Sequence, residues 1–217
     1  MSGAGVTAAA AGMAVAGLGA GSGVTVLARR VVPGEDPWWP PGVVTAVAFT
    51  ALWLRLQASP LLPALCYLAA VGVPLAFIDA RHKRLPDLLT LPSYPVALAL
   101  LAVAAPFVHS GGRHLVYGLI GMAAVWLFFV LQAFVYPSGI GWGDVKLSGV
   151  IGLYLGWFGA STLLAGLIGG YLLAAVTGIG LIVARRATRK SQIPFGPFLI
   201  AGALAVLIVA GPAGHFP

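Results

Sequence analysis

The stretch Ser138–Leu147 reads Ser-Gly-Ile-Gly-Trp-Gly-Asp-Val-Lys-Leu and sets an acidic side chain against a long apolar run. In it, Asp144 follows three glycines, in a chain that has only five Asp and Glu residues. A second acid, Asp79, stands at the edge of an earlier apolar segment. Ionisable groups in membrane segments are costly and are typical of functional sites. We therefore take these two carboxylates as the groups around which the fold is organised.

The composition excludes an ordinary soluble domain. Of the 217 residues, 60% are hydrophobic and 8% are charged, whereas a soluble domain carries roughly a quarter charged residues. The net charge of +7 comes from basic residues in short runs between apolar segments. This grouping indicates membrane topology and contact with anionic lipids rather than nucleic-acid binding. The sequence predicts an all-α, polytopic membrane helix bundle with a single domain over residues 1–217.

Eight apolar segments are candidate membrane spans. Several of them are shorter than the roughly 20 residues that a bilayer requires. They cover about residues 4–27, 43–56, 61–78, 91–108, 115–136, 144–157, 162–184 and 198–210. If each crosses the membrane, ten of the twelve Lys and Arg residues fall on one side, and only Arg55 and Arg113 on the other. The positive-inside rule makes the basic side cytoplasmic. Asp79, Asp144 and the loop before Pro194 then share the cytoplasmic face of an inner membrane, and both termini lie outside.

Cysteine and histidine usage argues against a disulfide framework and against a metal site. The one cysteine, Cys66, lies inside an apolar run and is expected to pack in the core. The four histidines have no metal-ligand spacing. We therefore expect neither a metal nor a cofactor. The start of the chain has no basic residue before Arg29, so we expect it to stay as a membrane segment rather than to be removed as a signal peptide.

Antiparallel packing of the two spans would bring Asp79 and Asp144 to one depth. Two interacting carboxylates tend to hold one proton between them. Such a pair activates a water toward a peptide carbonyl, because the ionised member takes the proton of the water and the protonated member hydrogen-bonds the carbonyl oxygen. The helix dipole favours Asp144, at a helix start, as the base and Asp79, at a helix end, as the acid. Arg81, His82 and Lys83 oppose that order.

Two structural alternatives remain open for these acids. Asp144 is also placed to be the N-cap of its helix, after a glycine turn. Asp79, beside a basic cluster, is also placed to form a surface ion pair of little energetic weight. Asp87, the third acid on this face, is expected to be an N-cap or a loop residue. Gly141 and Gly143 are expected to allow a tight turn and the approach of a substrate strand.

Three motifs in order along the chain resemble those of the type IV prepilin peptidases, a family of membrane aspartic proteases. Gly141-Trp-Gly143-Asp144-Val-Lys146-Leu is similar to the Gly-x-Gly-Asp motif of that family. Asp79 with Leu85-Pro86-Asp87-x-Leu89-Thr90 resembles its first catalytic segment. The third motif, which resembles a segment before a late helix of the family, is Gln192-Ile193-Pro194-Phe195-Gly196-Pro197-Phe198.

The resemblance implies that Asp79 and Asp144 are the catalytic pair, with the other motif residues in support. It implies hydrolysis of the bond after a short basic leader, ending in Gly, of type IV pilin-like precursors. Long members of that family carry a domain with paired cysteines that is associated with N-methylation. With one cysteine, this chain resembles a short form for which methyltransferase activity is not expected. The archaeal preflagellin peptidases share the acid pair, and the Pro-Phe-Gly-Pro-Phe segment favours the bacterial form.

Two other classes of function are compatible with membrane-embedded acids. A proton-coupled transporter or channel uses such acids as relays, but here they stand at span ends, and no inverted repeat with broken helices is evident. A non-catalytic assembly subunit would tolerate Asp144→Asn.

Overall fold

A computed structural model describes residues 3–30, 37, 39–136, 140–186 and 194–209. This part of the chain is helical and contains no β-strand. Ser138 and Gly139 of the glycine stretch, Glu35, Asp36, and residues 187–193 with most of the last basic loop lie outside the described residues. The helices are α1 (Gly3–Ala28), α2 (Trp39–Leu56), α3 (Leu62–His82), α4 (Asp87–Ala104), the short η1 (Ala105–Phe107), α5 (Gly111–Val135), α6 (Trp142–Trp157), α7 (Ala160–Val183) and α8 (Gly196–Val209).

The eight α-helices correspond one to one with the eight predicted spans. Five of them, α1, α3, α4 (with η1), α5 and α7, are long and apolar enough to cross a membrane, and α8 is a shorter apolar helix. α2 and α6, with 18 and 16 residues, complete the bundle. The boundaries differ from the predicted ones by a few residues, because polar and glycine residues at the segment ends are also helical. The all-α membrane bundle is confirmed.

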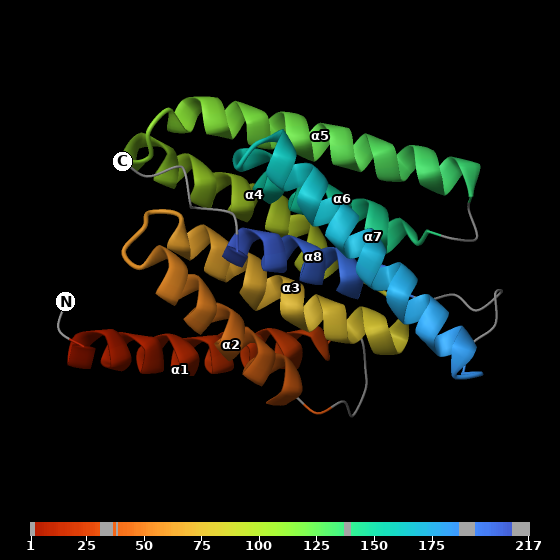
Figure 1. Ribbon diagram of the computed structural model, residues 1–217, viewed down its shortest axis with the longest axis horizontal. Helices are drawn as coiled ribbons and strands as arrows, with labels where there is room; N and C mark the ends of the chain where they lie inside the picture. The colour runs from red at the N-terminus through yellow and green to blue at the C-terminus, as the bar shows by residue number, and fades with distance from the viewer. Residues whose placement is uncertain (1–2, 31–36, 38, 137–139, 187–193, 210–217) are drawn as a thin grey trace.

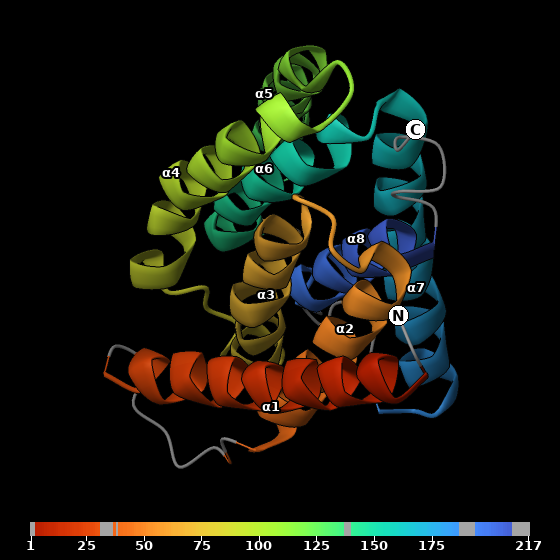
Figure 2. The same cartoon turned by 90° about the vertical axis from the view of Figure 1, so that its left-hand side faces the viewer.

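Successive helices run in opposite directions, and the other helices pack around α3 and α8. Figure 1 shows α1 and α2 along one side of α3 and α8, and α4, α5 and α6 along the other. Seen at right angles, α1 crosses below the bundle at a steep angle to α3 (Figure 2). The start of α1 and the end of α8 lie toward the same end of the bundle, opposite to the end where α3 finishes and α6 begins (Figure 1).

Glycines allow α5 and α6 to approach closely. A Cβ on Gly121 would lie 2.5 Å from the carbonyl oxygen of Gly152 and 2.8 Å from the Cα of Gly156. Small residues at such crossings let backbones touch, which is how helices associate in lipid. Gly170 of α7 meets the first turn of α8 in the same way, 3.1 Å from the Phe198 carbonyl oxygen. Gly152 and Gly156, and Gly166 and Gly170, each pair four residues apart, are predicted by their spacing to be packing notches, and the contacts confirm this role.

In α1, small residues stand four apart at Gly17 and Gly21 and again at Gly19 and Gly23, which predicts two close-packing pairs. Only one of the pairs makes contacts. Gly17 and Gly21 pack against Ala46 and Thr45 of α2, whereas a Cβ at Gly19 or Gly23 would meet nothing within 4 Å. The expectation for the second pair is wrong because it lies on the opposite face of the helix.

The core is formed largely by α3 and α6. All residues of α6 from Leu147 to Trp157 are buried, and so are twelve residues of α3. Cys66 is buried at 9% exposure, as predicted. By contrast, α5 and α7 expose many large apolar side chains, which is the arrangement expected where helices face lipid.

Candidate active site

Asp79 lies in the last turn of α3. The helix continues to His82, and Lys83 ends it in the left-handed conformation (φ 53°), with its N–H bonded to the Asp79 carbonyl oxygen at 2.8 Å. The next residues, up to Pro86, are not helical, since a residue before proline is disfavoured in a helix. The Asp79 side chain is 5% exposed. It therefore points into the bundle, and the surface ion-pair alternative for Asp79 is wrong.

Asp144 lies in the first turn of α6 and is 7% exposed. Gly141, in an extended conformation (φ −75°, ψ 145°), is the N-cap, so the expectation that Asp144 takes that position is wrong. Asp144 is the third helical residue instead, and its Oδ2 lies beside Gly141, 3.6 Å from the position that a Cβ on that glycine would take. A carboxylate at the third helical position can reach back toward the N-cap amide, as in half of a capping box.

The two carboxylates meet at Gly196, the first residue of α8. A Cβ on Gly196 would lie 2.7 Å from Asp79 Oδ2 and 3.3 Å from Asp144 Oδ1, which bounds the separation of these two oxygens at about 6 Å. The Gly196 backbone thus lies beside both carboxyl groups, and the two acids interact electrostatically. Three motifs far apart in the sequence thus converge on one point.

One oxygen of each carboxylate lacks a hydrogen-bond partner. Asp79 Oδ2 and Asp144 Oδ1 are buried and accept no hydrogen bond of normal geometry from the described residues. Buried polar atoms are nearly always satisfied, and an exception calls for an explanation. These are the same two oxygens that lie beside Gly196. Both unsatisfied oxygens therefore lie on the Gly196 side of their carboxyl groups, where the two acids approach each other.

A glycine is required at position 143 by a close contact with the Leu85–Pro86 segment rather than by a tight turn. A Cβ on Gly143 would lie 2.9 Å from the Cβ of Leu85, so the loop after α3 packs directly on the start of α6. Neither Gly141 nor Gly143 has a positive φ. Pro86 is the buried N-cap of α4, and its carbonyl accepts from the N–H groups of Leu89 and Thr90. The Leu-Pro segment thus fixes α4 and α6 relative to Asp79.

Asp87 and Lys146 form an ion pair across the beginnings of α4 and α6. Lys146 Nζ lies 2.8 Å and 2.9 Å from the two carboxylate oxygens of Asp87. Asp87 is the first residue of α4 and not its N-cap. The Lys146 side chain is 37% exposed and the Asp87 side chain is 57% exposed, so the pair contributes little to stability. It gives Lys146 a partner within the site region, distinct from the buried acids.

The sequence analysis missed an aromatic cluster next to the carboxylates. Phe195, which precedes Gly196, packs against Tyr171 of α7 and Phe129 of α5 with centroid distances of 4.8 Å and 5.8 Å. The Tyr171 hydroxyl donates to Gln132 Oε1 at 2.7 Å. A signal was present, since Gln132 is an amide inside an otherwise apolar span.

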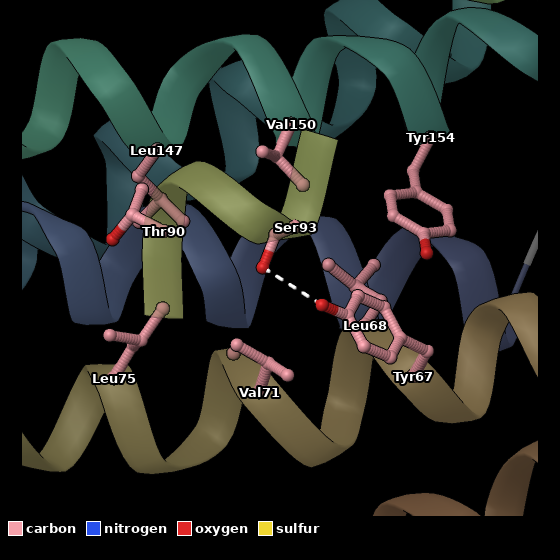
Figure 3. Close-up of a pocket in the computed structure, with 10 residues that line it drawn as sticks. Tyr67, Leu68, Val71, Leu75, Thr90, Ser93, Leu147, Val150 and Tyr154 are labelled. Carbon is pink, nitrogen blue, oxygen red and sulfur yellow. Dashed lines mark hydrogen bonds between the residues drawn. The ribbon is translucent and has the colours of Figure 1, made fainter. Parts of the chain in front are cut away.

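A mostly apolar cavity lies one helical turn deeper than the carboxylates, between α3, α4 and α6 (Figure 3). Leu75 and Leu147, which line it, precede Asp79 by four residues and follow Asp144 by three. Its polar groups are all engaged. Tyr67 and Ser93 share a hydrogen bond of 3.2 Å, which Figure 3 draws, and the Tyr154 hydroxyl donates to the Ala64 carbonyl at 2.9 Å.

The donor set at the carboxylates consists of two acids. Within the described ranges, no group of three or more His, Cys, Asp or Glu side chains is placed to hold a metal ion. What the arrangement offers chemically is a pair of carboxyl groups and a backbone amide in a buried site.

Comparison with known proteins gives a consistent family. A sequence model of the type IV leader peptidase family matches residues 66–183, which include both acids. The prepilin leader peptidase/N-methyltransferase of Aeromonas salmonicida is 36% identical over 171 residues, covering 76% of this chain and 53% of the relative. The protein of the same name from Aeromonas hydrophila is 37% identical over 167 residues, with 73% and 55% covered.

A more distant relative of the same name, from Bacillus subtilis, is 29% identical over 163 residues, covering 75% of this chain and 62% of the relative. The chain thus spans about half the length of the first two relatives. No solved structure matches it. Since the family match extends over more than half of the 217 residues, the chain belongs to the type IV leader peptidase family.

Proposed function

We propose that this protein is a membrane aspartic endopeptidase that removes the short basic leader of type IV prepilin-like precursors, with Asp79 and Asp144 as the catalytic pair. The observation that carries this proposal is the meeting of two buried carboxylates at Gly196, each with one unsatisfied oxygen. Such oxygens are free to bind a water and a peptide carbonyl.

The separation of the two oxygens is compatible with a shared water. Two hydrogen bonds of up to about 3.0 Å let one water join oxygens no more than about 6 Å apart, which equals the upper limit that the Gly196 geometry sets on their separation. One ionised carboxylate removes a proton from this water as its oxygen attacks the scissile carbonyl carbon. The other, protonated, donates a hydrogen bond to the carbonyl oxygen.

The resulting tetrahedral intermediate collapses when the carbon–nitrogen bond breaks. The carboxyl group that took the proton from water returns it to the leaving nitrogen, so the products are the leader carboxylate and a new amino terminus. The pair ends the cycle holding one proton again, as two close carboxylates do. Asp144 at a helix start and Asp79 at a helix end have the placement from which we predicted base and acid; that assignment stays a prediction.

We place the active site at the cytoplasmic face of the inner membrane. Basic residues follow α1, α3 and α7 and stand near the start of α6, at the same end of the bundle as the carboxylates. A precursor held in the membrane by an apolar helix would present the junction with its leader at this depth. The proposal covers hydrolysis, the reaction in which a carboxylate pair serves as acid and base.

The test is cleavage of a co-expressed type IV prepilin of Aeromonas salmonicida in membranes, followed by gel shift, for wild type, Asp79→Asn and Asp144→Asn. We expect the wild type to cut and both variants to accumulate uncut precursor while their own level in the membrane is unchanged. Cleavage at the wild-type rate by either variant would reject the paired-acid mechanism. A wild type that cuts no pilin-like precursor would favour the transporter class instead.

A further inference from the structure

The position of the Gly196 amide must be maintained closely. The backbone of Gly196 approaches the carboxylates so nearly that not even a methyl group fits. Its amide is also one of the first N–H groups of α8, which have no partner within their own helix. The segment that carries it is therefore part of the site, and something in the fold has to hold it there.

Phe195 is the anchor of this segment. Its carbonyl oxygen accepts from the N–H groups of Phe198 and Leu199, both at 3.1 Å, and so begins α8. Its ring packs on Tyr171 at 4.8 Å and on the fully buried Phe129 at 5.8 Å. A movement of either ring would shift the Phe195 backbone, and with it the adjacent Gly196 amide.

Tyr171 is in turn held by a hydrogen bond in addition to its packing contacts. Its hydroxyl donates to Gln132 Oε1 at 2.7 Å, and Gln132 follows Phe129 by three residues, on the same face of α5. A phenylalanine at 171 would fill the same space. The hydroxyl adds direction, since one hydrogen bond to a second helix limits rotation and tilt of the ring.

The cluster is also close to the reacting groups. Phe195 directly precedes Gly196 in the chain, and Gly170, the residue before Tyr171, packs against the first turn of α8. Thus α5 and α7 both reach the beginning of α8 through neighbouring residues. Neither Tyr171 nor Gln132 belongs to the three motifs from which the family was inferred.

We propose that Tyr171 is a positioning residue that, through its hydrogen bond to Gln132 and its contact with Phe195, holds the Gly196 amide against the Asp79–Asp144 pair. The proposal rests on the proposed peptidase function for its kinetic consequence. Its structural consequence, the placement of the Gly196 amide, is independent of that function.

The first test is steady-state cleavage of the Aeromonas salmonicida prepilin by the purified full chain. Tyr171→Phe removes only the hydroxyl, and Gln132→Leu removes only its acceptor. We expect each to lower kcat about tenfold with KM changed less than about twofold, because a misplaced active-site group costs rate rather than binding. The double variant should be no slower than either single one, since both changes break the same bond.

Tyr154→Phe is the matched control. It also removes a buried tyrosine hydroxyl, bonded to the Ala64 carbonyl at 2.9 Å, but deep in the bundle. We expect it to lower the unfolding temperature and to leave kcat of the folded protein unchanged. If Tyr171→Phe behaves like this control, or retains the wild-type kcat, the positioning role is wrong.

The second test is amide hydrogen exchange of the same proteins, which needs no substrate. In Pro194-Phe195-Gly196-Pro197-Phe198 two residues lack an N–H, so a peptide from this region reports mainly on Gly196 and its neighbours. Tyr171→Phe should speed this exchange about tenfold, and Tyr154→Phe should not, since local opening is set by local contacts. Unchanged exchange in Tyr171→Phe would overturn the inference.

The outcomes separate the two proposals. If Asp144→Asn still cleaves, or the wild type does not cleave, the peptidase proposal fails and the kinetic role of Tyr171 fails with it, whereas the exchange experiment still decides its structural role. If Asp144→Asn is inactive and Tyr171→Phe matches the wild type in both measurements, only the positioning inference fails.

Discussion

The helices α3, α4 and α6 carry two groups of polar side chains that differ in their hydrogen bonding. In the cavity between α3, α4 and α6, the hydroxyls of Tyr67, Ser93 and Tyr154 all have partners. At the carboxylates, Asp79 Oδ2 and Asp144 Oδ1 have none of normal geometry among the described residues. On the same helices, the hydroxyls deep in the bundle thus have hydrogen-bond partners, whereas one oxygen of each carboxylate does not.

The difference indicates what each group contributes. An unsatisfied buried acceptor costs about 1–3 kcal/mol, so two of them persist only where the surrounding fold is stable enough to tolerate them. Satisfied hydroxyls in an apolar cavity stabilise the fold modestly and specify how the helices pack. We therefore expect changes at the carboxylates to alter rate more than stability, and changes at the cavity to alter stability more than rate.

Outside the two acids themselves, the largest effect on the comparison is expected from Gly196→Ala. Its Cβ would lie 2.7 Å from Asp79 Oδ2, so the carboxylates must separate or α8 must shift. We expect kcat to fall by about 100-fold, because small displacements of reacting groups are costly. Gly180→Ala on α7 is the control, since nothing lies within 4 Å of its Cβ. Equal activity in the two variants would contradict the site geometry.

Gly143→Ala is expected to have the next largest effect, on both stability and cleavage. Its Cβ would lie 2.9 Å from the Cβ of Leu85, and such overpacking typically costs about 1–3 kcal/mol. The Leu85–Pro86 segment would move away from α6, and cleavage should fall about tenfold, as expected for a smaller displacement of the site. Gly23→Ala, which faces open space in α1, should leave both unchanged. Normal stability in Gly143→Ala would show that the Leu85 contact is not tight.

Tyr154→Phe tests the cavity side of the comparison. Removing the hydroxyl leaves the Ala64 carbonyl without this donor, which should lower the free energy of unfolding by about 1 kcal/mol. The single buried Cys66 allows the measurement, because a thiol-reactive fluorophore labels it only on unfolding. A variant with wild-type stability but slower cleavage would reverse the roles that we assign to the two regions.

The smallest effect is expected from Asp87→Asn. Its ion pair with Lys146 is partly exposed, and pairs of this kind contribute about 0.2–1 kcal/mol. Since Lys146 already neutralises Asp87, the pH profile of cleavage should also be unchanged. A shifted profile would show that Asp87 acts on the buried pair, and the profile at high salt would show whether the interaction is electrostatic.

Much of this arrangement could be predicted from the sequence, because membrane helices have strong compositional signals. The eight helices, the packing glycines Gly152, Gly156, Gly166 and Gly170, and the buried Cys66 were predicted from hydropathy and small-residue spacing. That Asp79 and Asp144 would share one depth was predicted from antiparallel alternation alone.

Other features depend on the rotation of each helix about its axis, which sequence does not specify. Gly19 and Gly23 were given the same packing role as Gly17 and Gly21, but face away from α2. The contact of Leu85 with Gly143 and the pairing of Tyr171 with Gln132 join residues more than 35 positions apart. The N-cap role predicted for Asp87 was wrong because Pro86 fixes the start of α4 one residue earlier.

The most direct test of the central claim, that the carboxylate pair serves reaction and not folding, is to measure unfolding and cleavage together in Asp144→Asn. We predict that cleavage falls by a factor on the order of 10³ or more, while the unfolding temperature stays at or above that of the wild type, because a buried charge with an unsatisfied oxygen is removed. An Asp144→Asn protein that cleaves normally, or that loses cleavage only as far as it loses stability, would contradict the account.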